Sequence, residues 1–466
     1  MQKQPKLDAQ IHKLTEGAYL FCSPQGNILF GCPPEILKRI LAMHLPMPDT
    51  VVLPSKLHHI HSSQASLEFP LYHFLFVQRG LERKRQFHVV SASNQSKGLE
   101  QLLRLTVVGP DSQEMEKAGT PQILAGELYQ ETDYMALKDP KTGKSFSIPE
   151  MVKFLSLDEG GNLELYPLRG KFPQVILERG GEARFRVLYG EHAFDLDLTV
   201  TKSQEPNYNV KHLPHIPAVN GFTTTVLGRS NGFDPNDPAN GYLLDINGRL
   251  LMWDCPAYLN LQLSKMKVGY EKVEAMILSH VHEDHIDVVE SLRQPPIDLY
   301  TTPEIYYSLL VKISAVFGCS LDEAKKYHVW HPLEPEKPIS LLGAEMTVFH
   351  SVHAIPSLGG RFKVEIGGKS AVLHITGDHL SHSAIQSMAT GGGISERRRS
   401  LFDGLITGDE DLILVDVGGG VIHGDYHDYL GYKGRARIGF MHTGLVPPDL
   451  PDKMKLVDSG EVWTIL

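Results

Sequence analysis

The segment 277–287 is rich in histidines and carboxylates, which directly follow a short apolar run. The segment holds three imidazoles and three carboxylates, and Met276, Ile277 and Leu278 form the apolar run. Such a run suits a buried strand, and the carboxyl end of a strand is where open α/β sheets present their chemistry. The pattern therefore predicts an α/β fold in which a strand delivers a metal site.

The spacing of the ligand-type residues suits two ions. His280 and His282, two residues apart on an extended turn, can reach one ion, and the adjacent Asp284 and His285 diverge enough to serve a second. Nitrogen and oxygen ligands of this kind suit zinc, with manganese or iron as alternatives. A solvated polar loop, or a few core histidines, is the competing interpretation. Four ligand-type residues within six positions favour the metal site.

The pattern His-x-His-x-Asp-His resembles the signature of the metallo-β-lactamase superfamily. Upstream, a hairpin with a Gly-loop ends its last strand at Asp254, which resembles the opening of the ribonuclease Z and cyclic-nucleotide phosphodiesterase branch. The resemblance covers about residues 220–446. It implies an αββα sandwich in the C-terminal half of the chain.

Later strand ends carry the remaining ligands in this family, and the sequence matches those motifs. His353 is followed closely by proline and glycine, so the resemblance favours it over His350 as the third-motif histidine. Asp378, at a strand ending in Gly-Asp, matches the fourth motif, and His442 matches the fifth. The ligand set that the resemblance implies is His280, His282 and His353 on one ion, Asp284, His285 and His442 on the other, and Asp378 bridging both.

The same resemblance gives two residues near the ligands a supporting role. Asp254 matches an outer-sphere aspartate that holds the ligand loop by hydrogen bonds, with a turn or helix cap as the alternative role. His379 follows the bridging aspartate directly, and we expect it to support a ligand or to contact the substrate.

Relatives in this branch place a histidine between the fourth and fifth motifs that protonates the leaving oxygen. His423 is the candidate general acid here, with Asp425 as its orienting partner, and Asp284 is counted as catalytic besides its metal role. The usual His-Glu dyad of the family is missing from this glycine-rich stretch. A glycine turn with surface histidines is therefore the competing interpretation.

Three glycines precede Arg397, Arg398 and Arg399 in the segment 391–400. One interpretation is a mobile loop whose guanidinium groups meet a phosphate. The favoured interpretation is a solvated helix start with Ser395 as its cap.

Composition limits the setting in which the protein works. The formal net charge of −10 argues against bulk electrostatic coating of nucleic acid. Four cysteines form no C-x-x-C pair, and the N-terminus leads into no apolar signal segment. Nowhere do about 18 apolar residues run together. We therefore expect a cytoplasmic protein that does not span a membrane.

A length of 466 residues exceeds one ordinary core, so we expect two domains. Residues 1–205 are predicted to form a mixed α/β, non-catalytic domain. Residues 206–219, which contain three prolines, are predicted to be a linker, and residues 220–466 the catalytic domain.

A weak internal repeat relates the two halves of the chain. The aligned segments are 26–33 with 248–256, 51–53 with 276–278, and 69–72 with 297–300. The N-terminal counterpart of the ligand segment has His58, His59 and His61 but no Asp-His pair, which favours a structural role for these histidines. The first domain is thus interpreted as a degenerate copy of the second, with a fortuitous likeness of two βαβ units as the alternative.

The implied function is that of a dinuclear metal-dependent hydrolase, foremost a phosphodiesterase. Its substrate would be a cyclic or other small nucleotide, or RNA, attacked by a metal-bridging hydroxide. A di-iron redox or oxygen-activating protein is an alternative class, against which His282 argues because such proteins often place a carboxylate there. Lactone or thioester hydrolysis and a non-enzymatic sensor also stay open. A small phosphodiester is the expected partner, and a homo-oligomer is left open.

Overall fold

The computed structural model describes residues 9–60, 62–166 and 172–466, which divide into two compact units. The first unit consists of the described residues of 1–103, 146–207 and 313–319, and the second of 104–145, 208–312 and 320–466. The break after Asn207 falls in the expected linker 206–219, which forms no helix or strand. Residues 104–145, predicted as part of the first domain, group with the second unit instead. We call this segment the arm.

The first unit contains twelve strands. They are β1 (Gln10–Thr15), β2 (Ala18–Ser23), β3 (Gly26–Phe30), β4 (Thr50–Val52), β5 (His58–His59), β6 (Ser62–Ser63), β7 (Phe87–Val90), β8 (Val152–Leu155), β9 (Asn162–Tyr166), β10 (Val175–Arg179), β11 (Arg184–Tyr189) and β12 (His192–Asp197). The sheet β1-β2-β3-β4-β7-β8 packs on the antiparallel sheet β12-β11-β10-β9 through buried side chains such as Phe21, Phe30 and Phe185.

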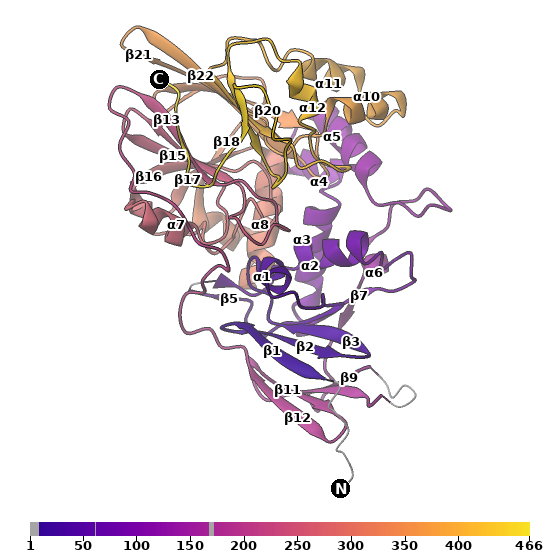
Figure 1. The fold of residues 1–466 in the computed structure, drawn as a ribbon. Coiled ribbons are helices and arrows are strands. Elements are labelled where there is room, and N and C mark those ends of the chain that lie inside the picture. The colour runs from indigo at the N-terminus through magenta and orange to yellow at the C-terminus, as the bar shows by residue number, and fades with distance from the viewer. Residues whose placement is uncertain (1–8, 61, 167–171) are drawn as a thin grey trace. The chain divides into compact units, whose positions relative to one another are not determined.

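The second unit contains the remaining strands. They are β13 (Phe222–Gly228), β14 (Gly241–Ile246), β15 (Arg249–Trp253), β16 (Val273–Ile277), β17 (Ile297–Thr301), β18 (His328–Pro332), β19 (Ile339–Leu341), β20 (Ala344–Ser351), β21 (Ser357–Ile366), β22 (Lys369–Ile375), β23 (Leu412–Asp416), β24 (Arg437–Met441), β25 (Met454–Leu456) and β26 (Val462–Thr464). They form two seven-stranded sheets, in the orders β18-β17-β16-β15-β14-β13-β26 and β19-β20-β21-β22-β23-β24-β25 (Figure 1). Trp253 of the first sheet packs against Phe362 of the second, with ring centroids 5.9 Å apart. The two sheets therefore share a core.

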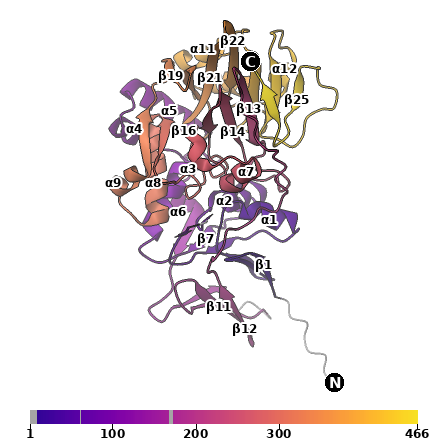
Figure 2. The ribbon, with the colours of Figure 1, turned by 90° about the vertical axis from the view of Figure 1, so that its left-hand side faces the viewer.

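Helices connect these strands and build most of the arm. They are α1 (Ile36–Ala42), α2 (Glu68–Tyr72), which continues into a π-helical turn (His73–Val77), α3 (Ser96–Val107), α4 (Ser112–Ala118), α5 (Gln122–Met135), α6 (Ile148–Met151), α7 (Leu259–Lys265), α8 (Pro303–Phe317), α9 (Leu321–Ala324), α10 (His382–Thr390), α11 (Glu396–Phe402) and α12 (His427–Leu430), with 3-10 turns at Tyr270–Lys272 and Lys325–Tyr327. Asp111 starts α4 with a capping box, which fixes the beginning of the arm's first complete helix. Figure 2 shows α4 and α5 beside α8.

Every predicted ligand motif follows a strand of the second unit. Asp254 comes directly after β15, and the ligand loop follows β16; these two strands pair in parallel. In the other sheet, β22, β23 and β24 also run parallel. Carboxyl ends of parallel strands meet at one edge of a sheet, so this topology brings the motifs together.

The six-stranded sheet of the first unit repeats the strand pairing of β13 to β18. Both series pair antiparallel twice and then parallel three times. Gly31 and Asp254 follow equivalent strands, and both have a left-handed backbone, with φ of 71° and 63°. Ala65 forms an isolated β-bridge with Cys32, and Ile286 forms one with Cys255. Gln64 and His285 come directly before these bridge residues, so they occupy equivalent positions. The first unit thus keeps the backbone plan and lacks the aspartate and histidine.

One part of the predicted repeat is wrong. The predicted repeat matches residues 69–72 with residues 297–300, which lie in strand β17. Phe69–Tyr72 instead lie in helix α2. The strand that pairs with β4, as β17 pairs with β16, is β7. The physical reason is the spacing of the apolar side chains. Leu67, Leu71 and Phe74 recur at helical intervals and are all buried.

Within the described residues, no single helix has the length and apolar character needed to cross a membrane; the bent pair Pro303–Phe317 and Leu321–Tyr327 passes that test together, by length and composition alone.

Candidate metal centre

Asp254 ties the ligand loop to the end of β15. Its amide donates to the Ile277 carbonyl at 2.8 Å, where β16 ends. Its carboxylate accepts hydrogen bonds from the amide and hydroxyl of Ser279 at 2.7 and 2.8 Å, and lies 2.8 Å from Nδ1 of His285. Asp254 is fully buried, so these contacts replace the water that its charge has lost. They are the contacts expected of an aspartate that orients a ligand loop.

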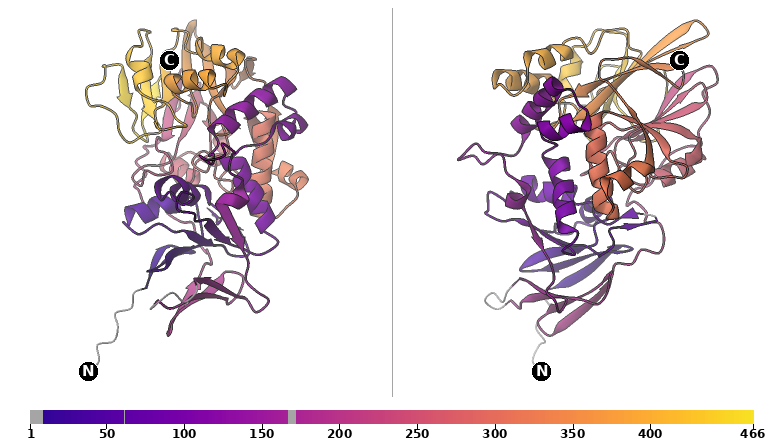
Figure 3. Two further views of the ribbon diagram at one scale, coloured as in Figure 1. Left: turned by 90° about the vertical axis from the view of Figure 1, so that its right-hand side faces the viewer. Right: turned by 180° about the vertical axis from the view of Figure 1, so that it is seen from behind.

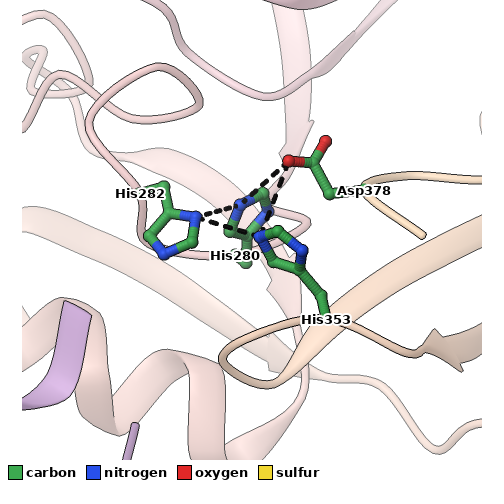
Figure 4. A group of neighbouring side chains, drawn as sticks. All are labelled: His280, His282, His353 and Asp378. Carbon is green, nitrogen blue, oxygen red and sulfur yellow. Dashed lines mark hydrogen bonds and ion pairs between the residues drawn. The ribbon is translucent and has the colours of Figure 1, made fainter. Parts of the chain in front are cut away.

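His280, His282, His353 and Asp378 form one group of converging side chains, drawn in Figure 4. One ligand atom from each lies within 4.8 Å of the others. Nδ1 of His282 is 3.0 Å from Nε2 of His280 and 3.1 Å from Nε2 of His353. Oδ2 of Asp378 lies 3.8 and 3.6 Å from those two Nε2 atoms. All four side chains are buried, so the group is sheltered from bulk water.

Asp284, His285 and His442 form a second group beside the first. Nε2 of His442 lies 3.3 Å from Oδ2 of Asp284 and 3.5 Å from Oδ2 of Asp378. Nε2 of His285 lies 3.1 Å from Oδ1 of Asp378. Asp378 therefore faces both groups. Gly377 makes its approach possible, because it has φ of 62° and a β-carbon there would lie 2.1 Å from a backbone oxygen of β21.

Contacts outside the two groups hold several rings by their outer nitrogen. Nδ1 of His280 lies 3.0 Å from the Ser279 hydroxyl, and Nδ1 of His353 donates to the Ile422 carbonyl at 3.0 Å. Each ring therefore turns its other nitrogen inward. Such outer contacts fix both the tautomer and the direction of a metal-binding imidazole.

The inner atoms fit divalent metal ions. Nε2 of His285 and Oδ1 of Asp378 face each other at 3.1 Å, but within the described part of the chain neither has a partner in hydrogen-bond geometry. The same holds for both ring nitrogens of His442. Buried polar atoms rarely stay without a partner, and an ion bound between them would be such a partner. Imidazole nitrogens with carboxylate oxygens are a donor set that zinc, manganese and iron accept.

The electrostatics of the site agree with this donor set. Burial lowers the pKa of His280 and His282 well below the usual range and that of His353 to about 4, which keeps these rings neutral, as metal binding requires. His285 behaves oppositely. Burial alone would lower its pKa, but Asp378 and the other nearby carboxylates raise it well above the usual value. The carboxylates thus favour a positive charge at this point, and a bound cation would take the place of the proton.

Comparisons with known proteins find sequence similarity to phosphodiesterases. The family model for the Anti-Pycsar protein Apyc1 matches residues 222–389. The cGMP-dependent 3',5'-cGMP phosphodiesterase A of Dictyostelium discoideum is 34% identical over 151 residues, 32% of this chain and 17% of the relative. The cAMP/cGMP-dependent 3',5'-cAMP/cGMP phosphodiesterase B of the same organism is 22% identical over 478 residues, 89% of this chain and 42% of the relative. The chain spans less than half the length of these curated relatives.

Among solved structures, the metallo-β-lactamase fold protein YhfI from Bacillus subtilis aligns with 52% of this chain and 98% of its own. The two are 19% identical, and the TM-score is 0.38. In the second unit, two packed seven-stranded sheets carry the His/Asp groups at their strand ends. This arrangement agrees with the sandwich that the sequence resemblance implies.

The candidate acid lies beside the proposed ligands, but its predicted partner is wrong. Nδ1 of His423 is 2.9 Å from Oδ2 of Asp416, at the end of β23, and 3.7 Å from Oδ2 of Asp378. Asp425 pairs instead with the exposed His427 at 2.7 Å. The chain turns through consecutive glycines between Asp416 and His423, which brings residues seven apart into contact. Burial opposes protonation, but Asp416 and then Asp378 raise the pKa of His423 to about 9.

His379 supports the turn before His353. Its Nδ1 accepts a hydrogen bond from the Val352 amide at 3.1 Å, and its own amide donates to Asp416 at 3.0 Å. Its ring lies against Phe402, with centroids 4.9 Å apart. These contacts are those of a residue that positions the turn.

The arginines of segment 391–400 form ion pairs within the second unit. Ser395 caps α11 by accepting from the Arg398 amide at 3.1 Å, as the favoured interpretation predicts. Arg398 is buried in a two-pronged pair with Glu131 of the arm, at 2.8 and 2.9 Å. Arg397 pairs with Glu127, also of the arm. These two guanidinium groups thus anchor the arm.

Within the described residues, His58 and His59 show no metal-binding arrangement. The ring of His58 stacks on Phe317, with centroids 4.2 Å apart, and its Nδ1 contacts the Val316 carbonyl at 3.1 Å. None of the groups that could hold a metal among the described residues includes His58 or His59. His61 lies outside the described residues.

Two contributors to the site were missed from the sequence. Asp416 ends an apolar strand, as Asp254 does, and that shared signal could have pointed to it. The Thr106 carbonyl, 2.9 Å from Nε2 of His282, gives no sequence signal because every residue has a carbonyl.

Proposed function

We propose that the protein is a dinuclear metal-dependent phosphodiesterase acting on a cyclic or other small nucleotide. The observation that carries the proposal is the convergence of two buried His/Asp groups that both face Asp378. His280, His282 and His353 would hold one ion, and Asp284, His285 and His442 the other, with Asp378 shared.

Two divalent ions in such a site supply a nucleophilic water at neutral pH and neutralise charge on a phosphoryl group. Zinc is the first choice for these donors, with manganese or iron as alternatives. The chain's own residues orient the ligands and exclude bulk water. Asp254 fixes the loop that presents Asp284 and His285, and burial keeps competing water away.

His423 is the proton donor to the leaving oxygen in this proposal. Asp416 accepts from Nδ1 of its ring, which fixes the ring and leaves Nε2 as the second site of proton exchange. His423 is partly accessible, whereas the ligands are buried. The ring of His423 can therefore be reached from solvent.

The substrate class rests on the sequence relatives. The names of phosphodiesterases A and B of Dictyostelium discoideum specify cyclic nucleotides. The net charge of −10 favours a small nucleotide over a long RNA, because a polyanion meets repulsion at each phosphate. His282 stands where di-iron relatives often have a carboxylate, which favours hydrolysis over oxygen chemistry.

The test begins with metal analysis of protein purified without added metal. Two equivalents of zinc or manganese are expected per chain, and tightly bound iron with a visible absorption band would contradict the proposal. Hydrolysis of bis-p-nitrophenyl phosphate and of cyclic nucleotides is then compared with a lactone panel. Preference for the lactones would point to the other hydrolase class.

Substitution separates the site from the rest of the protein. Asp378→Ala and His282→Ala are expected to lower activity at least about a thousandfold, since each removes a ligand from a site worth several kcal/mol in the transition state. His427→Ala is the matched control, because His427 is exposed and pairs with Asp425 away from the ligands. Unchanged activity in Asp378→Ala would show that the site is wrongly assigned.

A further inference from the structure

The ring of His282 is held by the backbone of the arm. Its Nε2 lies 2.9 Å from the carbonyl oxygen of Thr106, in the last turn of α3. A carbonyl can only accept, so Nε2 carries the hydrogen and Nδ1 keeps its lone pair. Nδ1 is the atom that faces His280 and His353. In Figure 4 the second nitrogen of His282 points away from the group.

Three other ligand histidines have their outer contacts elsewhere in the chain. His280 contacts Ser279, His353 contacts Ile422, and His285 contacts Asp254. All three partners come from residues 220–466. Of these four histidines, His282 alone takes its partner from the arm.

Buried contacts hold the arm against the rest of the second unit. Arg398 pairs with Glu131 and also donates to the His350 carbonyl at 3.0 Å, three residues before His353. The Thr120 hydroxyl donates to Glu304 at 2.6 Å, and Glu304 contacts Nε2 of His350 at 2.7 Å. Figure 3 shows the arm helices against this part of the unit from two sides. These contacts hold in place the segment that carries the Thr106 carbonyl, the hydrogen-bond partner of His282.

We propose that the arm, residues 104–145, is a positioning element of the metal centre: the Thr106 carbonyl holds His282 in the tautomer and orientation that present Nδ1 to the ion. Outer contacts of this kind change metal affinity about 10- to 100-fold when they are lost. The inference rests on the proposed metal centre. It adds that residues far from the ligand motifs in sequence determine whether that centre forms.

Two glycines of the arm provide a matched test. Gly109 and Gly119 each follow a helix with a left-handed backbone, φ of 87° and 114°, and an added β-carbon would make only ordinary contacts at each. Alanine strains both turns, by at least about 1 kcal/mol each. Gly109 lies three residues after Thr106. Its amide donates to the Arg104 carbonyl at 3.0 Å, which completes the last turn of α3. Gly119 ends α4 instead.

The measurement is zinc affinity of the full chain by competition with a chelator. G109A is expected to bind zinc about tenfold or more weakly, and G119A within about twofold of wild type, at similar thermal stability. Wild-type affinity in G109A, or an equal loss in G119A, would overturn the inference. Wild type that binds neither zinc nor manganese would overturn the proposed function itself.

A second measurement covers the case in which G109A fails to fold. Nitrogen-15 NMR of the metal-free wild type reports the tautomer of each imidazole, and the His282 signals are assigned by their loss in His282→Ala. Hydrogen on Nε2 is expected. Hydrogen on Nδ1 would exclude the carbonyl contact and the inference with it.

Discussion

The leaving oxygen decides how much a general acid matters at this site. Ribose oxygen leaves as a strongly basic alkoxide unless it is protonated, whereas p-nitrophenolate is stable without a proton. A histidine fixed by Asp416 beside the ligands suits the first kind of substrate. The contribution of His423 is therefore expected to depend on the substrate.

His423→Gln is expected to lower kcat for cyclic AMP about a hundredfold and to change turnover of bis-p-nitrophenyl phosphate by less than about fivefold. Metal content should stay at the wild-type value, because the proposed ligands remain. Asp416→Asn should show the same split to a smaller extent, since it leaves the ring in place without its orienting charge. Equal losses on both substrates would mean that His423 acts through the metal ions.

His374 gives a pH dependence to stability that is separate from catalysis. It is buried on β22 and stacked on Phe349, and among the described residues neither ring nitrogen has a hydrogen-bond partner. Burial lowers its pKa from 6.5 to about 4. The unfolded chain therefore takes up a proton below pH 6.5, and the folded protein does not until about pH 4. Stability falls as pH falls across this window.

His374→Phe should remove up to about 3 kcal/mol of that acid-induced loss, which corresponds to the shift in pKa. The ring keeps its stacking partner, so stability at pH 7 should be similar or higher. Urea unfolding at pH 7 and at pH 4.5 measures the difference. The same slope against pH in both proteins would exclude His374 as the source.

The positions of the candidate ligands could be predicted from sequence where the residues follow a strand. The ligand pattern from His280 to His285, and His353, Asp378 and His442, all follow apolar runs, and the structure brings them together. The partner of His423 could not be read in this way. Nearness in sequence pointed to Asp425, but the glycine turn places Asp416 against the ring.

At the scale of elements, the buried pair between Arg398 of α11 and Glu131 of α5 holds the arm. Both side chains are 2% exposed, so removal of one partner leaves a buried charge without compensation. Glu131→Gln is expected to destabilise the protein by about 3–5 kcal/mol. The double variant Glu131→Leu with Arg398→Met should recover most of this loss, because no charge stays buried.

Arg399 provides the control for that experiment. It pairs with Glu396 at 2.6 Å on the same helix, but Glu396 is 76% exposed. Arg399→Met should therefore change stability by less than about 1 kcal/mol. Thermal unfolding of the four proteins compares the effects. A loss in Arg399→Met as large as that in Glu131→Gln would show that the helix itself, not the buried pair, is being tested.

Elements with a clear apolar period were predictable, and those that depend on distant contacts were not. Strand β16 and the cap of α11 follow from local sequence. Residues 69–72 have a short apolar run that fits either a strand or a helix, and only burial beside Leu67 and Phe74 selects the helix. The assignment of the arm depends on Glu127 and Glu131 meeting arginines about 270 positions later.

At the scale of the whole molecule, the sequence indicated two domains and a break near residue 206, but it placed the arm with the wrong one. Chain order suggested contiguous domains, whereas the second unit is assembled from three segments. The two units share one strand-pairing plan, and among the described residues the converging His/Asp groups lie in the second. A shared strand-pairing plan is visible in sequence as weak repeats, whereas the grouping of residues 104–145 with the second unit is not.

Residues 206–466 alone are therefore not expected to fold into a metal-binding unit. Without the arm, Arg398 loses Glu131, Glu304 loses Thr120, and His282 loses its carbonyl partner. An uncompensated buried charge costs about 3–5 kcal/mol, a large fraction of the roughly 5–15 kcal/mol that stabilises a protein. The shortened chain should show no cooperative thermal transition and hold no stoichiometric zinc, and residues 104–145 supplied in trans should restore part of both. Cooperative unfolding with full zinc content in the shortened chain would instead show that the arm is not needed, and that residues 206–466 fold and bind metal by themselves.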